Sequence, residues 1–466
     1  MTLKLRKFQI EDVRRIEKLG GKVLLANDMG LGKSPTSIGW WMAHPEIKRV
    51  LVICPANLKW HWQDEFAIHA KTRCDILEGR KPRTRVPMIS AKVVIVNYDI
   101  LQYWVDYLKK LKFQLVIIDE CQYVRAPDRQ VGKKESMYSI RTDSVRRLCR
   151  KIDHRLALGG TGSLENRPAE MFAILNVLRP DLFPAFFPFA QRYCEPRRKP
   201  WGWEYKGSTR LKELHKILKD NLMIRRKKED VLHDLPQRTR IVLPMRDVGL
   251  REYVQLEKEL KKWANDQGLR NRKLKGEIRA QAFLMCGEML RKCAKMKLPS
   301  VLEWVDNFLA NGNEKIILFG LHKFVIRALQ KHFGNKAVVI SGATPMKNRK
   351  GLTRRFNTEN SCRIMIAQLK AAGVGWSARQ CSNTGTLEYW WNPAVHTQAD
   401  DRVYGMNRGH DGRPVFNYYF TARGTIDERM CALLQRKQKD IDAVLDGKDE
   451  TEFDLLDQLV RETVYA

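Results

Sequence analysis

The eight residues NDMGLGKS, Asn27–Ser34, follow directly after the apolar run Val23–Ala26. Gly30 and Gly32 allow the backbone to turn closely enough for its N–H groups to surround phosphate oxygens, and Lys33 adds a positive charge. The residues that come next have helical spacing, so the loop is expected between a strand and a helix N-terminus, as in a phosphate-binding P-loop. The alternative is a helix cap followed by a flexible turn. We favour an ATP site here, even though an asparagine replaces the first glycine of the usual pattern.

Short, continuous apolar runs follow this loop, separated by stretches with helical spacing. Such alternation is typical of buried parallel strands connected by helices. The sequence therefore predicts a doubly wound α/β lobe that binds ATP over residues 1–180. Besides the strand before the loop, the expected strands are Val50–Cys54, Val93–Val96, Leu115–Ile118 and Arg155–Leu158.

Residues 181–300 differ from the first lobe, because Pro, Phe and Trp cluster early and long Lys/Arg-rich helical patterns follow. We expect a helical insertion and linker there, with an aromatic and basic segment, because no strand pattern is visible. The alternation then resumes and predicts a second α/β lobe over residues 301–446, while the acidic residues 447–466 are interpreted as a solvated helix or tail. The expected strands of the second lobe are Lys315–Phe319, Ala337–Ile340, Arg363–Ile366 and Thr386–Tyr389.

The chain has 466 residues and a formal net charge of +32, from 85 Lys and Arg against 53 Asp and Glu. Such an excess predicts a polyanionic partner, although a merely soluble basic protein is the alternative. No apolar run approaches the roughly 18 residues that a membrane helix needs, so no membrane partner is expected. The ten cysteines form no C-x-x-C pair, which favours reduced core thiols and a cytoplasmic location, nucleoid-associated or, for a viral protein, in the host cytoplasm.

Two carboxylates, Asp119 and Glu120, end the predicted strand Leu115–Ile118. Open α/β sheets place their ligand sites at this end of a strand. Asp119 and the hydroxyl of Ser34 can hold Mg²⁺ beside the phosphates, and Glu120 can orient and deprotonate the attacking water. A strand that ends in Asp-Glu is often only a turn. The phosphate loop 85 residues upstream favours the catalytic interpretation.

Phosphoryl transfer is also assisted by a cation that a second domain supplies, which is worth roughly 10³ to 10⁵ in rate. Arg402 is the candidate, within the stretch QADDRVYGMNRGH at Gln398–His410 of the second lobe. The alternative is an arginine in a surface ion pair.

In order and spacing, the motifs of this chain closely resemble those of the Swi/Snf-type ATPases of helicase superfamily two. The similarity runs from residue 3 to residue 446 and ends in TIDERM and VLDG. Within the family, RYCEPRRKPWGWEYKGS at Arg192–Ser208 and IRRKKEDVLHDLPQR at Ile224–Arg238 look most like the HepA-related, annealing-helicase branch. The motifs that carry the resemblance are LRKFQ (Leu5–Gln9), NDMGLGKS, CPANLKWHWQDEF (Cys54–Phe66), DECQ (Asp119–Gln122), GGTGSLENRP (Gly159–Pro168), AAGVGWS (Ala371–Ser377), WWNP (Trp390–Pro393) and QADDR (Gln398–Arg402).

The resemblance implies two RecA-like lobes that close on ATP and Mg²⁺, with double-stranded DNA across both and moved along one strand's backbone. Gln9 would bind the adenine, and the carboxylates would be those of the Walker B motif. The residues implied at the nucleotide are Arg6, Gln9, Gly30, Gly32, Lys33, Ser34 and Gln398. Those implied at DNA are Asn57, Lys59, Trp60, Asn97 and Tyr98 in the first lobe, and Lys323, Lys370, Trp376 and Trp391 in the second. Phosphate contacts do not read sequence, so little base preference is expected. Buried core aromatics and solvated lysines are the alternatives.

Several positions depart from the family's usual pattern. Cys121–Gln122 replaces Ala-His after the carboxylates, which is expected to alter coupling more than metal binding. Gly159 and Gly162 replace Thr and Pro in the third motif, so the backbone there should be looser. Gly405 replaces a second arginine, and Arg408 is the nearest substitute. Either a local respacing brings Arg408 to the γ-phosphate, or this chain hydrolyses ATP poorly.

The segment PRRKPWGWEY, Pro196–Tyr205, interleaves cations with aromatics. We hypothesise that it binds DNA at a branch. The alternative is a folded hairpin whose tryptophans pack onto the surrounding helices.

Together these observations predict a DNA-dependent ATPase that translocates on double-stranded DNA. It would remodel branched DNA by fork regression, branch migration or reannealing, in replication, recombination or repair. Two alternatives stay open: a strand-separating helicase, for which we identify no wedge element, and a nucleotide-gated DNA-binding clamp with weak hydrolysis. Because the chain begins almost at its first motif and ends just after its last, nucleosome remodelling is not expected. The sequence gives no evidence for an obligate protein partner.

Overall fold

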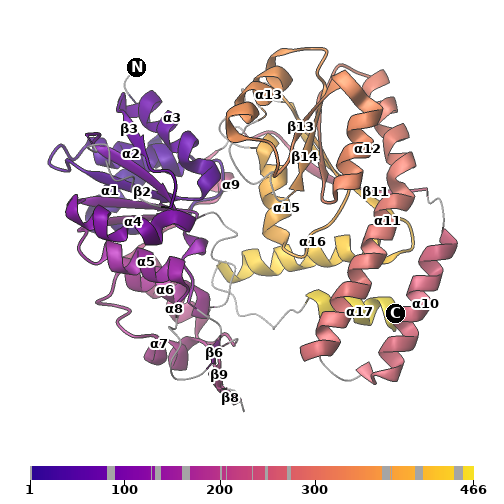
Figure 1. Cartoon of the computed structure of the whole chain (residues 1–466), viewed down its shortest axis with the longest axis horizontal. Coiled ribbons are helices and arrows are strands. Elements are labelled where there is room, and N and C mark those ends of the chain that lie inside the picture. The colour runs from indigo at the N-terminus through magenta and orange to yellow at the C-terminus, as the bar shows by residue number, and fades with distance from the viewer. Residues whose placement is uncertain are drawn as a thin grey trace. The chain divides into compact units, whose positions relative to one another are not determined.

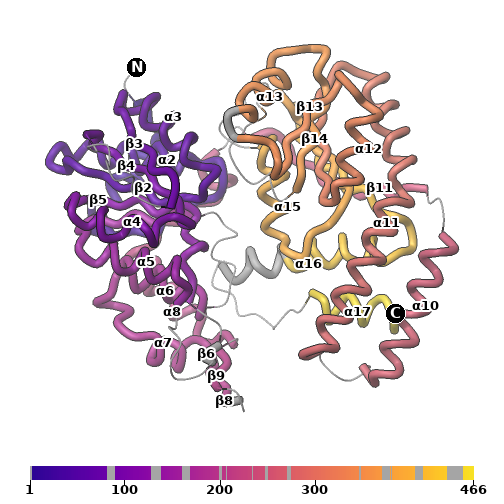
Figure 2. The backbone as a smooth tube through the Cα atoms, in the orientation of Figure 1, coloured from indigo at the N-terminus to yellow at the C-terminus, as the bar shows by residue number. Residues whose placement is uncertain are grey.

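The computed structural model describes residues 3–80, 90–126, 129–131, 138–159, 168–199, 202–205, 207–232, 235–246, 250–269, 274–369, 378, 380–404, 413–445 and 455–465. The chain forms two compact units. The first consists of residues 1–233 with 441–450, and the second of residues 234–440 with 451–466. Each unit is built around its own β-sheet with helices packed on it, as Figure 1 and the backbone trace in Figure 2 show.

The sheet of the first unit has seven strands in the order β10-β1-β7-β5-β2-β4-β3, and each neighbouring pair is parallel. All residues of β2 and β4 are buried, as expected for continuous apolar runs covered on both faces. The strands are β1 (Lys22–Leu25), β2 (Val50–Cys54), β3 (Cys74–Ile76), β4 (Val93–Asn97), β5 (Leu115–Asp119), β7 (His154–Leu158) and β10 (Met223–Ile224). The helices are α1 (Lys7–Lys18), α2 (Lys33–Met42), α3 (Lys59–Ala70), α4 (Tyr98–Lys110), α5 (Ile140–Cys149), α6 (Pro168–Leu178), α7 (Phe186–Tyr193), α8 (Leu211–Asn221) and α9 (Lys228–Val231), with the 3₁₀ turns η1 (Ala56–Leu58) and η2 (Cys121–Tyr123).

The sheet of the second unit has six strands in the order β11-β16-β15-β12-β14-β13, again with parallel pairs only. Two parallel α/β sheets confirm the predicted fold class. The strands are β11 (Arg238–Met245), β12 (Ile316–Gly320), β13 (Ala337–Ile340), β14 (Ile364–Gln368), β15 (Asn383–Thr386) and β16 (Val415–Ala422). The helices are α10 (Leu250–Asp266), α11 (Gly276–Ala310), α12 (Lys323–Phe333), α13 (Met346–Thr358), α15 (Pro393–Asp400), α16 (Ile426–Leu445) and α17 (Leu455–Val464), with η5 (Gly334–Lys336) and η6 (Asp401–Val403).

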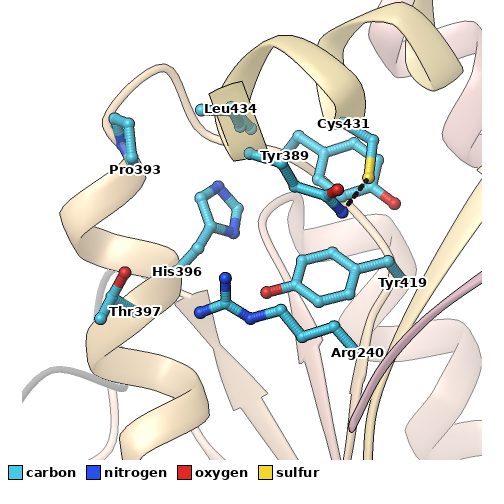
Figure 3. Close-up of a pocket in the computed structure, with 9 residues that line it drawn as sticks. Arg240, Tyr389, Pro393, His396, Thr397, Tyr419, Cys431 and Leu434 are labelled. Carbon is cyan, nitrogen blue, oxygen red and sulfur yellow. Dashed lines mark hydrogen bonds between the residues drawn. The ribbon is translucent and has the colours of Figure 1, made fainter. Parts of the chain in front are cut away.

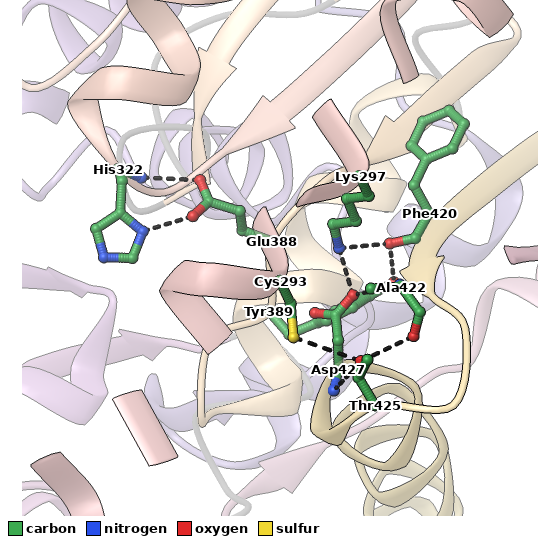
Figure 4. A network of polar contacts seen from close by, with 9 residues as sticks. All are labelled: Cys293, Lys297, His322, Glu388, Tyr389, Phe420, Ala422, Thr425 and Asp427. Carbon is green, nitrogen blue, oxygen red and sulfur yellow. Dashed lines mark hydrogen bonds and ion pairs between the residues drawn. The ribbon is translucent and has the colours of Figure 1, made fainter. Parts of the chain in front are cut away.

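A buried ion pair ties α11 to the sheet of the second unit and to α16. Nζ of Lys297 lies 2.5 Å from Oδ2 of Asp427 and donates to the carbonyl of Phe420 at 2.7 Å (Figure 4). The same carboxylate oxygen accepts from the amide of Ala422 at 2.9 Å. These hydrogen bonds offset part of the cost of burying the two groups, and they fix how α11 packs.

The helical expectation for residues 181–300 needs correction, because these residues also contain strands. β8 (Arg197–Lys199) and β9 (Gly202–Glu204) form an antiparallel sheet with β6 (Arg129–Val131). β10 extends the first sheet, and β11 forms an edge of the second. The short strands are below the length at which periodicity is informative, and the basic residues of β11 hid its alternation. Pro244 lies in β11, which an edge strand tolerates.

The interpretation of the C-terminal residues as a solvated helix or tail also needs correction. Residues of α17 pack into the hydrophobic core of the second unit, together with α10 and α11. The spacing of these apolar residues is that of one helical face, which the acidic residues between them obscured. The buried residues of α17 are Leu455, Leu456, Leu459, Val460 and Thr463.

All ten cysteines lie buried and form no disulfide. Within the part of the chain that the structure describes, no helix is long and apolar enough to cross a membrane.

Candidate functional site

The loop after β1 has the geometry that phosphate binding requires. Gly30 and Gly32 have φ angles of 85° and 71°, in the left-handed region where other residues are strained. Gly32 lies directly before α2, so the loop leads into a helix N-terminus. Nζ of Lys33 donates to the carbonyl of Asn27 at 2.7 Å, which folds the lysine back over the loop. The loop Asn27–Ser34 is therefore flanked by a strand and a helix, as predicted.

The two predicted carboxylates lie where β5 ends. Oδ2 of Asp119 accepts from the indole N–H of Trp62 at 2.8 Å, and Oδ1 accepts from the amide of Glu120 at 2.9 Å. Burial, followed by the charge of Glu120, raises the pKa of Asp119 to about 7. Burial lowers the pKa of Lys33, and the negative charges of Glu120 and Asp119 oppose that shift. The lysine and both carboxylates therefore share one electrostatic environment.

Glu120 has a left-handed backbone, with φ 50° and ψ 55°. A non-glycine residue pays for this conformation in strain, which persists chiefly where the surroundings impose it. Gln122 donates from Nε2 to Oε2 of Glu120 at 2.6 Å, which orients the carboxylate. Sequence reasoning missed this role of Gln122 and treated the residue only as a departure.

These residues fit a nucleotide with Mg²⁺. The loop offers backbone N–H groups and an ammonium to phosphates, while Ser34 in the first turn of α2 and Asp119 offer oxygen ligands. Magnesium in such sites needs only one or two protein ligands, because phosphates and water complete its shell. Among the described residues, no three or more His, Cys, Asp or Glu form a group that could hold a metal ion by themselves.

A buried polar network behind the loop was not predicted. Asn27 is buried and donates from Nδ2 to Asp12 of α1 at 2.7 Å. The other oxygen of Asp12 accepts from Nε of Arg226 at 2.6 Å, and Arg226 also pairs with Glu11 at 3.1 Å. The asparagine that replaces the first glycine of the usual P-loop pattern thus ties the loop to α1. Only the fold brings Arg226 to a carboxylate 214 residues away, so no local signal could have identified it.

Arg226→Ala is expected to lower the free energy of unfolding of the first unit by about 3 kcal/mol, because Asp12 is fully buried and would lose its cation. Denaturant unfolding monitored by fluorescence measures this change. The matched control is Arg192→Ala, since Arg192 and Glu213 also pair at 2.6 Å but are exposed, and their loss should change little. Equal effects of the two substitutions would contradict a structural role for the Asp12 network.

Gln9 lies against the phosphate loop. It is buried, donates from Nε2 to the carbonyl of Leu31 at 3.1 Å, and accepts from the amide of Arg6 at 2.9 Å. Arg6 lies half-buried directly before α1. The adenine contact assigned to Gln9 stays a prediction, but the glutamine does contact the loop that would hold the phosphates.

In the second unit, α15 and η6 carry the predicted Gln398 and Arg402, both half-buried. Gly405 and Arg408, on which the respacing hypothesis depends, lie outside the described residues.

Two family models match the chain. The SNF2-related domain covers residues 13–298, which is more than half of the chain, and the helicase conserved C-terminal domain covers residues 298–407.

The chain belongs to the SNF2-related family.

Curated relatives place this SNF2-related protein near annealing helicases. It is 29% identical to the "SWI/SNF-related matrix-associated actin-dependent regulator of chromatin subfamily A-like protein 1" of Xenopus tropicalis, covering 93% of this chain and 44% of that protein. It is 27% identical to the "DNA annealing helicase and endonuclease ZRANB3" of Mus musculus, covering 97% and 41%. The chain thus spans less than half the length of these relatives. Both the SNF2-related family and the likeness to annealing helicases were predicted correctly.

A solved structure described as "Sulfolobus solfataricus SWI2/SNF2 ATPase core in complex with dsDNA" is 22% identical. The structural match covers 95% of this chain and 93% of the chain in that structure, with a TM-score of 0.45.

The positions implied at DNA in the first lobe of this SNF2-related chain differ in exposure. Trp60 is 40% exposed and Asn57 is half-buried. Lys59 is buried and donates from Nζ to the carbonyl of Leu77 at 3.0 Å. Tyr98 is buried too, and its hydroxyl donates to the carbonyl of Asp119 at 2.7 Å, while Asn97 is 5% exposed. Trp60 and Asn57 therefore offer the most accessible side chains of this set.

In the second unit, Lys323 is exposed in the first turn of α12. The carboxylate of Glu388 holds the residue directly before this helix, since Oε2 accepts from the amide of His322 at 2.9 Å and Oε1 lies 2.5 Å from its Nδ1 (Figure 4). Trp391 is half-buried, and its ring lies 5.1 Å from that of Phe283 of α11. Lys370 and Trp376 lie outside the described residues.

Two departures from the family pattern lie within the described residues. Cys121 is buried in η2, where burial raises the pKa of its thiol to about 12, so it is a core thiol. Gly159 follows β7, and its amide donates to the carbonyl of Leu25 in β1 at 3.1 Å. A looser backbone was predicted at Gly159. Its amide is instead hydrogen-bonded to the strand that leads into the phosphate loop. Gly162 lies outside the described residues.

Proposed function

We propose that this SNF2-related chain is a DNA-dependent ATPase that translocates on double-stranded DNA. We further propose that it remodels branched DNA in replication, recombination or repair by fork regression, branch migration or reannealing. The observation that carries the proposal is the pairing of the nucleotide loop with Asp119 and Glu120 in a chain of this family. The name of the mouse relative, an annealing helicase, supports the branched-DNA part.

Each of these residues of the first unit would have a separate role in ATP hydrolysis. The loop amides and Lys33 would bind the phosphates of ATP. Ser34 and Asp119 would hold Mg²⁺, which when bound would offset the negative charge of the phosphates. Glu120, oriented by Gln122, positions the attacking water and takes up its proton. Arg402 of the second unit adds positive charge where negative charge develops in the transition state.

DNA binding is supported by exposed cations and aromatic rings of the second unit. Arg291 and Lys295 of α11 are exposed, and their charged groups lie 6.0 and 5.8 Å from the ring centre of Phe324. Phe324 follows Lys323, which is also exposed. Cations grouped around an aromatic ring suit phosphate contacts with some stacking, and such contacts do not read sequence. The net charge of +32 supports the same partner.

The hairpin of β8 and β9 is our candidate for the branch contact. Arg197 and Arg198 are exposed, and Arg197 lies 3.7 Å from Glu195. The ring of Trp203 lies 6.1 Å from that of Phe187, which is 44% exposed. The hairpin thus has features of both sequence interpretations. Trp203 packs against Phe187, as in a folded hairpin, while Arg197 and Arg198 stay accessible to DNA.

Replacing Arg197, Arg198 and Lys199 with alanine is expected to weaken binding to a model fork by roughly tenfold, through the loss of up to three phosphate contacts. Binding to linear duplex should change little. Titration of labelled DNA at fixed salt measures both affinities. The matched control replaces Lys212, Lys216 and Lys219 of α8, which removes the same charge from the same unit. Equal loss on fork and linear DNA would remove the branch role.

Displacement of a third strand from a linear duplex tests translocation itself, and migration of a four-way junction tests branch remodelling. We expect ATP-dependent activity in both. Separation of a plain forked duplex into single strands would favour the strand-separating helicase instead. Activity in third-strand displacement but not in junction migration would indicate a translocase that does not remodel branched DNA.

A further inference from the structure

Arg402 lies in a single turn that is held from both sides. The turn η6 contains only Asp401, Arg402 and Val403, and Val403 is buried. Asp400 ends α15 before the turn, and Tyr404 follows it. A catalytic cation loses most of its effect when it is misplaced by about 1 Å, so whatever fixes this turn matters for the reaction.

One arginine from the edge strand of the same unit contacts both flanks of the turn. Nη2 of Arg238 lies 3.2 Å from Oδ2 of Asp400, and Nη1 lies 3.3 Å from Oδ1 of Asp401. The guanidinium also lies 5.0 Å from the ring centre of Tyr404, on the far side of Arg402 in the chain. A planar guanidinium can make these three contacts at once, whereas an ammonium cannot.

The guanidinium of Arg238 is itself fixed. Its Nε donates to Oδ1 of Asn417 in β16 at 2.8 Å, and Asn417 donates to Thr384 of β15 at 2.7 Å. The backbone of β11 pairs with β16 from Arg238, opposite Val415, to Met245, opposite Ala422. Only 18% of the Arg238 side chain is exposed, so solvent competes little for these contacts.

Asp400 is fully buried and anchored by further groups. Its Oδ2 accepts from the hydroxyl of Tyr419 at 2.6 Å and lies 3.7 Å from Nε of Arg240. Figure 3 shows Arg240 and Tyr419 pointing toward His396 of α15. The cavity that these residues line has a volume of about 20 Å³, room for one water, so it is a packing gap and no nucleotide site.

We propose that Arg238 is a positioning residue that holds Arg402 in place for ATP hydrolysis, by clamping Asp400, Asp401 and Tyr404. The inference rests on the proposed role of Arg402. Arg238 contributes through the geometry of the turn and makes no contact with substrate. The strand that opens the second unit thereby sets the position of the cation used in hydrolysis.

The test compares Arg238→Lys with the unsubstituted protein at saturating duplex DNA. We expect kcat to fall by about 10²-fold, while the KM for ATP, the affinity for DNA and the melting temperature stay close to their original values. Arg246→Lys is the matched control, since Arg246 directly follows the same strand and its side chain is exposed. Its kcat should change by less than about threefold.

A double-substitution cycle separates positioning from a general structural effect. Once Arg402→Ala has been made, adding Arg238→Lys should lower kcat no further, because the residue that it positions is gone. If the fold-losses of kcat from the two single substitutions multiplied in the double variant, the inference would be overturned. An unchanged kcat in Arg238→Lys alone would also overturn it. If Arg238→Lys fails to fold, Asp401→Asn and Tyr404→Leu, which each remove one contact of the clamp, take its place in the same cycle. An unchanged kcat in Arg402→Ala would instead overturn the proposed role of Arg402.

Discussion

Glu120→Gln is expected to lower steady-state ATP turnover by about 10³-fold, within the range that loss of a general base produces. Glutamine keeps the shape of the side chain but cannot accept a proton at neutral pH. The backbone of residue 120, already held in the left-handed region, should be unaffected by this isosteric change. Phosphate release measures turnover, and a fluorescent ATP analogue should bind the variant with nearly its original affinity.

The control for this substitution is Glu46→Gln, an isosteric change at an exposed glutamate of the same unit. It should leave turnover unchanged. If Glu120→Gln kept turnover within about threefold of the unsubstituted protein, Glu120 could not be the general base.

Arg402→Ala is expected to lower kcat by roughly 10³ to 10⁵, the contribution of a cation supplied to a phosphoryl-transfer transition state from a second domain. The ground state has less charge to stabilise, so ATP binding should weaken far less than kcat falls. Single-turnover hydrolysis with duplex DNA present measures the chemical step directly.

Arg423→Ala is the matched control for Arg402→Ala, because Arg423 is an exposed arginine of the same unit. The surface ion-pair alternative for Arg402 predicts equal, small effects of the two substitutions. A loss of kcat confined to Arg402→Ala would exclude that alternative.

The central strands and the nucleotide loop could be predicted because their signals are local. A continuous apolar run such as Val50–Cys54 can only be buried on both faces, and it forms β2. The glycines of the loop indicate a left-handed backbone conformation that other residues rarely adopt, and both Gly30 and Gly32 have positive φ angles.

Side-chain orientation within a helix was harder to predict. In α3 the apolar and polar residues show little periodicity, so the sequence does not say which tryptophan faces inward. Trp62 is buried and bonds to Asp119, whereas Trp60, two residues away, is exposed. Lys59 is likewise buried, although a lysine at a DNA-facing motif is expected in solvent.

Contacts between distant parts of the chain could not be predicted at all. Arg226 meets Asp12 across 214 residues, and Arg238 meets Asp400 across 162. Each contact depends on strand order: β10 pairs with β1, and β11 pairs with β16. Both arginines belong to the stretch that carried the family resemblance, but only the fold shows that one supports the nucleotide loop and the other the turn of Arg402.

The most direct test of the account is steady-state ATP hydrolysis by the purified chain with no DNA, single strand, linear duplex and a four-way junction. Glu120→Gln is measured alongside. We predict strong stimulation by the duplex and the junction, and its loss in Glu120→Gln. Turnover near background under every condition, combined with tight DNA binding, would contradict a motor and indicate a nucleotide-gated clamp.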